Sequence, residues 1–598
     1  MREFSVPPSV TVGDAANLTD PVWDNAETAA EVVQFARRTA DGWVDVTCGQ
    51  FRDQVLAVAR GLVAAGIEPA MRVGLMSSTR YEWTLLDYAI WTVGAITVPI
   101  YETSSAAQVA WILSDSAAAA CVVETADHEH LVAGLREQLP GLGEVWSIDG
   151  GAVDALIGHG AAVDPAEVEA RRRSVQADDV ATIIYTSGTT GRPKGCVLTH
   201  RNMCSDIANV IPVLRNLFHQ GSTTLLFLPL AHAFARLIQI GVVQVRAKLG
   251  HSADLKNLVA DLGAFRPTFI LSVPRVFEKV YNSAHQRAQA EGKGRIFAKA
   301  EQVAIAYSQA LDTRCRPGLP LRARHRLFDL LVYRKLRAAL GGRCTTAISG
   351  GAPLDTRLGH FFRGIGVTIL EGYGLTEPSP AATANVPGAI RLGTVGRPLP
   401  GVSIRIADDH EILIKGELVF DEYWNNPEAT AEALTDDGWL RTGDLGALDD
   451  EGFLTITGRK KEIIVTAGGK HVAPDPLEER VRAHPLISQA VVVGDRRPFV
   501  AALVTIDENV WPRWLAEHRR PARTSVADLR TDEALCADVR AAVDDANRAV
   551  SQAEAIKAFR ILPRDFTEAA GELTPSLKVK RPVVHQTYGA EIADIYGS

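Results

Sequence analysis

A chain of 598 residues is too long to fold around one hydrophobic core, and its 46% hydrophobic and 22% charged residues are typical of globular proteins. The formal net charge of -8 and the pI of about 6.0 argue against a surface that binds nucleic acid generally. The seven cysteines are scattered, odd in number and include no C-x-x-C pair, which argues against a disulfide framework and a zinc-binding pattern.

The N-terminal segment has no apolar stretch followed by small residues, so it does not have the pattern of a secretory signal. The longest uncharged apolar runs, such as residues 88–101, fall short of the roughly 18 residues that a membrane-spanning helix needs. We therefore expect a cytoplasmic protein that contacts a membrane at most peripherally, at the inner membrane face.

The first part of the chain alternates β-branched runs with helical patterns. Strands are expected at 72–77 and 96–101, on either side of a helix over 81–95. A second series has strands at 223–230 and 268–274, with a helical stretch through 251–263. Strands separated by helices of this length predict an α/β fold with mostly parallel sheets.

Residues 280–340 change to long helical patterns rich in Ala, Arg and Leu. Within them, basic side chains from Arg322 to Arg337 surround apolar residues such as Leu327, Leu330 and Leu331. This pattern favours a solvated surface helix, and a patch that lies on a membrane surface is the alternative.

The last part of the chain begins a new strand-helix-strand pattern after Gly458. Before it, a sheet-like segment covers 401–420, and residues 449–452 predict a tight turn between two strands. We therefore expect a large N-terminal region over 1–457, a hinge at 458–461 and a small α+β domain over 462–598.

The segment YTSGTTGRPKG (185–195) concentrates glycines, hydroxyl side chains and Lys194 in one predicted loop. It follows a strand-like run at 181–186 and precedes a helical start at 199–210, so its N–H and hydroxyl groups can hold phosphate oxygens. It is not a Walker A loop, because Lys194 follows a proline and precedes a glycine.

With this loop, six further strings make the chain resemble the adenylate-forming superfamily of acyl-CoA synthetases, luciferases and peptide-synthetase adenylation domains. In chain order the strings are LPLAHAFA (228–235), SGGAPL (349–354), EGYGLTE (371–377), GWLRTGD (438–444), GRKKEII (458–464) and LTPSLKVKR (573–581). The segments at 98–105, 360–377 and 553–562 are most similar to the long-chain fatty acyl-CoA synthetase branch.

The resemblance implies a large N-terminal region and a small mobile C-terminal domain, and a two-step reaction. A fatty carboxylate attacks the α-phosphorus of ATP and expels pyrophosphate, and the thiol of CoA then displaces AMP from the acyl-adenylate. The implied substrates are a fatty acid, ATP and CoA, with Mg²⁺ as the metal. Such a step depends on positioned cations and donors, which matches a loop rich in donors.

The resemblance also implies a site in the large region. The β- and γ-phosphates would bind Thr186, Ser187, Gly188, Thr189, Thr190, Gly191 and Lys194. Thr376 would meet the α-phosphate, and Glu377, together with Thr190, would bind Mg²⁺. Adenine would lie between Tyr373, flanked by Gly372 and Gly374, and the wall formed by Gly350, Gly351 and Ala352.

The ribose hydroxyls would bind Asp444 and Arg459, and Lys461 would be the hinge residue. Lys578 would enter the site to neutralise the carboxylate and the α-phosphate during adenylation, and Gly468 and Gly469 would let the pantetheine arm of CoA pass. His232 either is a core residue or lies beside the acyl and phosphate sites.

The leading hypothesis is a long-chain fatty acid-CoA ligase. One alternative hands the acyl-adenylate, or that of another carboxylate, to a separate carrier protein, because the chain has no carrier attachment pattern with an appended carrier domain. A third, from a different class, is a catalytically silent nucleotide-binding protein. The joint presence of Lys194, Glu377, Asp444, Arg459 and Lys578 argues against the silent alternative.

Overall fold

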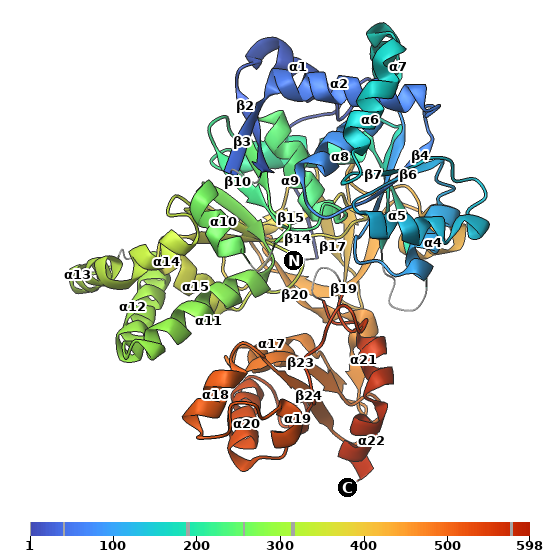
Figure 1. Cartoon of the computed structure of the whole chain (residues 1–598). Helices are drawn as coiled ribbons and strands as arrows, with labels where there is room; N and C mark the ends of the chain where they lie inside the picture. The colour runs from blue at the N-terminus through green and yellow to red at the C-terminus, as the bar shows by residue number, and fades with distance from the viewer. Residues whose placement is uncertain are drawn as a thin grey trace. The chain divides into compact units, whose positions relative to one another are not determined.

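The structure is a computed structural model that describes residues 2–39, 42–186, 192–254, 257–312, 317–574 and 578–597. It is an α/β protein with two compact units (Figure 1). The first unit comprises Met1–Arg405, Leu413–Thr442 and Leu448–Leu454, and the second comprises Ile406–Ile412, Gly443–Ala447 and Thr455–Ser598. The predicted α/β class, with one large and one small part, is confirmed.

The first sheet of the first unit has the strand order β7-β6-β4-β5-β8-β9. Its pairs are parallel except the last, in which β8 and β9 are antiparallel. The strands are β4 (Arg72–Met76), β5 (Ile96–Ile100), β6 (Ala120–Val123), β7 (Val145–Ser147), β8 (Val180–Thr186) and β9 (Lys194–Thr199). The antiparallel pair matters for the site, because its connection is the predicted phosphate loop.

Two further sheets are mixed, with parallel pairs at one end. One has the order β10-β11-β2-β3 and the other β12-β13-β14-β15-β16. Their strands are β2 (Val33–Thr39), β3 (Gly42–Thr47), β10 (Thr223–Leu226), β11 (Lys248–His251), β12 (Phe269–Ser272), β13 (Thr346–Ser349), β14 (Thr368–Tyr373), β15 (Thr383–Ala384) and β16 (Arg397–Pro398). Because β12, β13 and β14 run parallel, their carboxyl ends lie at one edge.

Helix α3 (Tyr81–Thr92) is buried along its whole length, because it packs against β4 and β5 of the first sheet and against β2 of the second. A helix that is buried on every side is expected only in such a position. The other helices of the unit before residue 270 are α1 (Asp20–Ala29), α2 (Cys48–Ala64), α4 (Ala106–Asp115), α5 (Ala126–Ala133), α6 (Ala152–His159), α7 (Pro165–Ser174), α8 (His200–Val213), α9 (Ala233–Gln244) and α10 (Leu258–Phe265).

The long helices predicted for 280–340 form a lobe at the left of Figure 1, and the prediction is confirmed. They include a π-helical turn at Asp329–Tyr333 between α13 and α14. The helices are α11 (Pro274–Ala290), α12 (Gly294–Asp312), α13 (Leu319–Phe328), α14 (Arg334–Ala339) and α15 (Thr356–Gly364). A short α16 (Pro427–Ala433) follows later in the chain.

A fourth sheet has the order β1-β17-β18-β19-β20, and its strands belong partly to each unit. It contains β1 (Glu3–Ser5), β17 (Ser403–Ile406), β18 (Glu411–Lys415), β19 (Leu440–Leu448) and β20 (Leu454–Arg459). The turn predicted at 449–452 joins β19 to β20, with Gly452 at a φ of 84°, where glycine is favoured.

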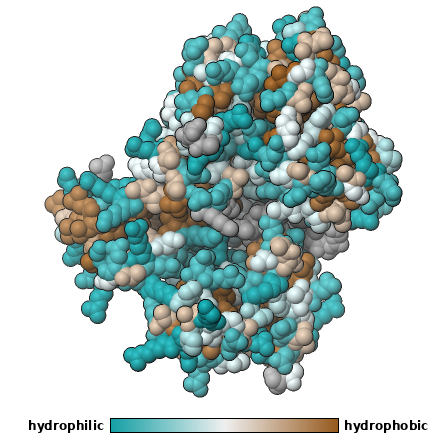
Figure 2. Space-filling model, viewed as in Figure 1, coloured by the Kyte–Doolittle hydropathy of each residue, from teal (hydrophilic) through white to brown (hydrophobic). Residues whose placement is uncertain are grey.

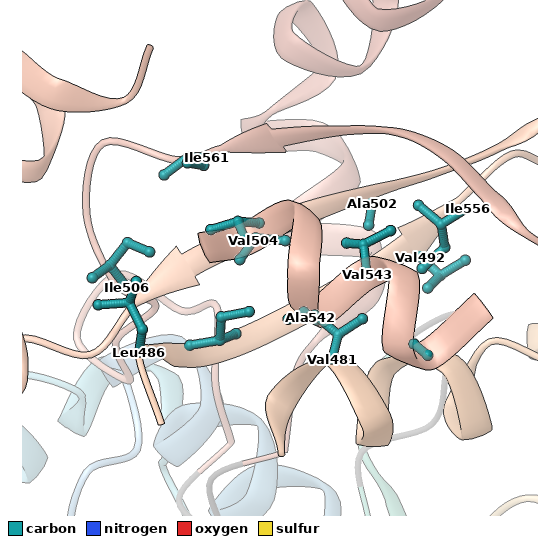
Figure 3. Close-up of a cluster of buried hydrophobic side chains, with 14 of the residues drawn as sticks. Val481, Leu486, Val492, Ala502, Val504, Ile506, Ala542, Val543, Ile556 and Ile561 are labelled. Atoms are coloured by element: carbon teal, nitrogen blue, oxygen red, sulfur yellow. The ribbon is translucent and has the colours of Figure 1, made fainter. Parts of the chain in front are cut away.

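The second unit is built on the sheet β23-β24-β25, which is covered on both faces. Figure 3 shows the face on which Val492, Ala502 and Val504 pack against Val481 of α17 and Val543 of α20. Side chains alternate along a strand, so neighbouring residues such as Leu503 pack on the other face, against α21 and α22. The elements are β21 (Ile464–Val465), β22 (His471–Val472), α17 (Asp475–Arg482), β23 (Ile487–Val493), β24 (Val500–Ile506), α18 (Trp511–Glu517), α19 (Val526–Leu529), α20 (Glu533–Asn547), β25 (Ile556–Ile561), α21 (Arg581–Thr587) and α22 (Gly589–Gly597).

The helical start predicted at 199–210 is confirmed, because α8 begins at His200, although the strand β9 between the loop and this helix was not predicted. The helix expected over 251–263 was placed too early, because it is α10, which begins at Leu258 after β11 has ended at His251. Within the described ranges, no helix is both long and apolar enough to cross a membrane.

Candidate functional site

The predicted phosphate loop connects the ends of β8 and β9. Thr186 and Lys194 are direct partners in this antiparallel pair, so they lie at the base of the loop. Ser187, Gly188, Thr189, Thr190 and Gly191 lie outside the described residues. The loop base is therefore fixed by strand pairing, and Lys194 is placed by β9, not by a helix N-terminus.

A short segment that follows β18 lies along β9. The N–H of Trp424 donates to the carbonyl of Gly195 at 2.7 Å, and Tyr423 forms an isolated bridge with Cys196. A Cβ atom on Gly195 would come within 3.2 Å of Trp424 and 2.8 Å of Ile183, so only glycine permits this approach. The pairing brings the Tyr423 ring to 5.2 Å from the Nζ atom of Lys194.

Tyr423 also contacts the predicted metal ligand. Its hydroxyl donates to Oε1 of Glu377 at 2.7 Å, and the N–H of Phe420 donates to the Glu377 carbonyl at 2.8 Å. Burial and then the charge of Glu377 raise the pKa of Tyr423, so the phenol remains protonated and can donate. One tyrosine thus contacts both Lys194 and Glu377, and sequence reasoning missed it.

The only sequence signal for Tyr423 is the aromatic pair in DEYWNN (421–426), which follows a predicted sheet and precedes GWLRTGD. Tyr423 is 46 residues from Glu377, and nothing in the spacing predicts that the two meet. Only the edge pairing with β9 reveals the contact.

The predicted adenine wall follows the end of β13. A Cβ atom on Gly350 would lie 2.9 Å from the Phe234 ring, and Gly351 has a φ of 82°. The neighbouring Ser349 hydroxyl is buried and has no hydrogen-bond partner among the described residues. A buried polar atom of this kind usually has a partner, so its position beside the wall fits a polar ligand.

Residues 371–377 begin in the adjacent strand β14 and continue beyond its end at Tyr373. Glu371 of β14 is the register partner of Ser349. Tyr373 is buried, with 9% of its surface exposed, and pairs with Thr383 in β15. A Cβ atom on Gly374 would lie 1.7 Å from the Pro380 carbonyl oxygen, so this position requires glycine. The structure therefore places the predicted wall and the predicted Tyr373 on neighbouring strands.

His232 caps helix α9. Its Nδ1 accepts a hydrogen bond from the N–H of Phe234 at 3.2 Å, and Phe234 is the residue against which Gly350 packs. The histidine therefore has a structural role, and its cap fixes the start of the helix turn whose Phe234 contacts the wall. Its predicted catalytic role stays a prediction.

Mg²⁺ commonly uses one or two carboxylates plus phosphate oxygens of the substrate. Glu377, which is partly exposed, supplies one such carboxylate, and its second oxygen is not used by the Tyr423 hydrogen bond. Among the residues that the structure describes, no group of three or more His, Cys, Asp and Glu side chains could hold a metal by itself. The second oxygen of Glu377 fits the role of a single carboxylate ligand beside substrate phosphates.

The second unit brings the predicted ribose ligands together. Arg459 Nε lies 3.2 Å from Oδ1 of Asp444, which is 4% exposed. Beside them, Lys460 forms ion pairs with Asp409 at 2.6 Å and Glu411 at 3.0 Å. Lys461, the predicted hinge residue, is exposed in the short helical turn Lys460–Glu462.

Lys578 belongs to the same unit and is half-buried. Burial and then the charge of Arg459 lower its pKa to about 8, against the opposing effects of Asp444 and Glu462. Its backbone N–H donates to the Thr574 hydroxyl at 3.0 Å, and its carbonyl accepts from the Thr574 N–H at 2.8 Å. The predicted adenylation lysine thus lies near the predicted ribose ligands.

Ion pairs with the buried carboxylates of Glu572 and Glu478 hold both ends of the segment that carries Lys578. Glu572 is fully buried, receives two hydrogen bonds from Arg564 at 2.7 and 2.8 Å, and accepts a third from Tyr588. Arg581 pairs with Glu462 at 3.0 Å and Glu478 at 2.7 Å. The ion pair between Arg581 and Glu462 links the segment that carries Lys578 to the helical turn that contains Lys461.

Gly468 and Gly469 are exposed in the turn between β21 and β22, and Gly469 has a φ of 76°. The next residue, Lys470, pairs with Glu554 at 3.1 Å. The structure places these glycines at an accessible turn, and their predicted contact with pantetheine stays a prediction.

Comparisons with known proteins agree with the resemblance. A family model described as AMP-binding enzyme matches residues 23–424, and one described as AMP-binding enzyme C-terminal domain matches residues 461–598. The chain is 53% identical over 599 residues to the long-chain-fatty-acid-CoA ligase FadD15 of Mycobacterium bovis and to that of Mycobacterium tuberculosis, covering 100% of each protein.

The fold is similar to that of solved adenylating enzymes. The A domain of carboxylic acid reductase from Segniliparus rugosus, in complex with AMP and a co-purified carboxylic acid, superposes with a TM-score of 0.74 at 21% identity. The match covers 98% of this chain and 95% of that chain. At this identity the likeness concerns the fold, and it confirms the fold predicted from the sequence.

Proposed function

The chain belongs to the AMP-binding enzyme family, and from that premise we propose that it is an ATP-dependent long-chain fatty acid-CoA ligase. The observation that carries the proposal is the 53% identity, without loss of either domain, to a ligase with this printed activity. The activity predicted from the sequence agrees with it. The described site residues add the groups that the chemistry needs.

The proposed reaction has two steps. A carboxylate oxygen of the fatty acid attacks the α-phosphorus of ATP, and the bond to the pyrophosphate oxygen breaks. The CoA sulfur then attacks the acyl carbon, AMP leaves, and the thiol proton passes to solvent. The carboxylate is already an anion at neutral pH, so the first step needs charge neutralisation and positioning more than a general base.

The first unit would hold the triphosphate and the base. In the proposal, Thr186, Lys194 and the loop between them bind the pyrophosphate end, and Thr376 binds the α-phosphate. Glu377 would hold Mg²⁺, which supplies charge neutralisation at the phosphates when bound. Tyr423 supports the proposal, because its contacts keep Glu377 and Lys194 in fixed positions.

The second unit would supply the remaining groups. Asp444 and Arg459 bind the ribose, and Lys578 neutralises the incoming carboxylate and the α-phosphate. The hinge at 458–461 lets this unit present Lys578 for adenylation and the Gly468-Gly469 turn for thioester formation. The ion pair between Arg581 and Glu462 supports this proposal, because it links the segment that carries Lys578 to the turn that contains the hinge residue Lys461.

We also place the enzyme in the cytoplasm, where it would take a poorly soluble acid from a membrane surface. The proposal is tested by supplying acetate, octanoate or palmitate with ATP and Mg²⁺, with and without CoA, and by measuring AMP and acyl-CoA. We expect both products with palmitate and CoA, and far less with acetate.

Two other results would contradict the proposal. Acyl-adenylate that forms but never passes to CoA would favour a separate carrier protein as the acceptor. No AMP with any acid would favour a silent nucleotide-binding protein.

A further inference from the structure

The exposed apolar side chains of the molecule are concentrated in the helical lobe. Of the ten large apolar side chains that are exposed in the described residues, six lie between Ile296 and Leu331. Leu319 is 79% exposed, and Leu327, Leu330 and Leu331 are 52 to 55% exposed. Figure 2 shows apolar residues gathered at the left, over the lobe that Figure 1 labels α12 and α13.

The lobe is already held to the protein by its other face. Nε2 of His325 lies 2.6 Å from the Gly364 carbonyl oxygen, and its ring stacks on Tyr307 with 3.9 Å between centroids. In the following turn, the Tyr333 hydroxyl donates to the Ala300 carbonyl at 2.6 Å. These contacts involve none of the exposed leucines, which lie at the surface although the lobe already packs against the protein.

The exposed leucines share one face. Leu319 and Leu327 are eight residues apart, which places them on one side of α13, and Leu330 and Leu331 follow in the π-helical turn Asp329–Tyr333. No residue of α13 is buried. An exposed apolar stripe of this length is unusual in a protein that has no partner for it.

Basic side chains flank this stripe. Residues 319–337 contain six arginines or lysines and one acidic residue, in a chain whose net charge is -8. The single acid, Asp329, is paired with Arg337 at 2.7 Å. Arg322, Arg324 and Arg326 are exposed, and they form no ion pair with any residue that the structure describes.

We propose that the face formed by Leu319, Leu327, Leu330 and Leu331, with Arg322, Arg324 and Arg326, docks on an anionic phospholipid bilayer. An apolar stripe bordered by basic residues suits a helix that lies in the membrane interface, with leucines among the acyl chains and arginines at the phosphates. A second copy of the chain is disfavoured, because pairing two such faces would bring their arginines together.

This inference locates the membrane contact that the proposed function invokes and rests on it, although docking uses no residue of the adenylation site. The full chain is tested by flotation with vesicles of phosphatidylcholine alone or of equal parts phosphatidylcholine and phosphatidylglycerol. We expect about tenfold more protein bound to the anionic vesicles, and release at high salt.

Two variants separate the parts of the face. Leu327→Glu with Leu330→Glu removes the apolar contact, and a triple Arg→Gln change at 322, 324 and 326 removes the charge. Each should lower vesicle binding at least about fivefold. The matched control is Val259→Glu on α10, which is 53% exposed and should bind like the unchanged protein.

The outcomes are decisive in either direction. Equal binding by the leucine variant and the control would overturn the proposal, as would no binding to either vesicle. A leucine variant that binds vesicles normally but changes from dimer to monomer in sedimentation would show that a second copy covers the face. AMP formation with detergent-dispersed palmitate, which should be unchanged in all variants, reports separately on the proposed function.

Discussion

At the scale of single residues, Tyr423 joins two groups on which the proposed adenylation depends. Its hydroxyl contacts Glu377, and its ring lies 5.2 Å from the ammonium of Lys194. A cation over an aromatic face is attracted to it, and a buried phenol that donates to a carboxylate fixes that carboxylate. We therefore regard Tyr423 as a positioning residue.

Tyr423→Phe should preserve the ring contact with Lys194 and remove the hydrogen bond to Glu377. Because a hydrogen bond to a charged group contributes about 1.5–3 kcal/mol, we expect ATP-pyrophosphate exchange to slow about tenfold or more. The loss should be partly offset by raised Mg²⁺. Tyr81→Phe, which removes the hydroxyl that donates to Gln54 at 2.8 Å, is the matched control. An unchanged exchange rate in Tyr423→Phe would refute the positioning role.

The lowered pKa of Lys578 predicts a pH dependence. Since the pKa falls from an ordinary 10.5 to about 8, the ammonium loses its proton as the pH rises through about 8. The adenylation half-reaction should therefore slow about tenfold for each further pH unit. Stopped-flow pH profiles measure this, and Lys578→Arg should remove the decline. A rate that stays level up to the ordinary lysine pKa would contradict the assignment.

Residues in ordered motifs could be predicted from the sequence, whereas contacts between motifs could not. Lys194, Glu377 and Lys578 each stand in a recognisable string. The contacts of Tyr423 depend on an edge pairing with β9, which no local pattern encodes.

At the scale of elements, a buried ion pair joins α3 and α9 to the strand that leads into the phosphate loop. Arg236 Nη2 lies 2.7 Å from Oδ1 of Asp87, and Nη1 donates to the Thr182 hydroxyl of β8 at 2.6 Å. The guanidinium also lies 5.4 and 5.1 Å from the rings of Trp83 and Trp91. This network fixes the direction in which β8 enters the site.

Asp87→Ala should leave the Arg236 charge buried without its partner and should destabilise the protein by about 3–5 kcal/mol. Replacing both, as Asp87→Leu with Arg236→Met, should be much milder because no charge is left. The midpoint of urea unfolding, followed by tryptophan fluorescence, measures the difference. If the double variant unfolds as early as Asp87→Ala, the buried charge is not the cause.

The sequence predicted elements well where their periodicity was strong. The strand at 72–77 and the helix at 81–95 appear as β4 and α3, because segments this rich in large apolar residues are buried in the sheet and between the sheets. It missed β9 because KGCVLT follows a glycine-rich loop directly, and its strand character depends on pairing with β8. It placed α10 too early because the apolar pattern of β11 merges with that of the helix.

At the scale of the whole molecule, the described site residues fall into two groups. The first unit contains Lys194, Glu377 and Tyr423, and the second contains Asp444, Arg459 and Lys578. The segment with Lys578 is held at both ends by ion pairs of its own unit, through the buried carboxylate of Glu572 and through Arg581. Adenylation, but not thioester formation, should therefore depend on this lysine.

The most direct measurement compares the two half-reactions of Lys578→Ala. Palmitoyl-adenylate formation from ATP should fall by about a thousandfold or more, because the carboxylate and α-phosphate lose the cation between them. Transfer of the acyl group from supplied palmitoyl-adenylate to CoA should stay within about twofold of the unchanged protein. An equal loss in both half-reactions, or an unchanged rate of adenylation, would show that Lys578 does not serve adenylation alone.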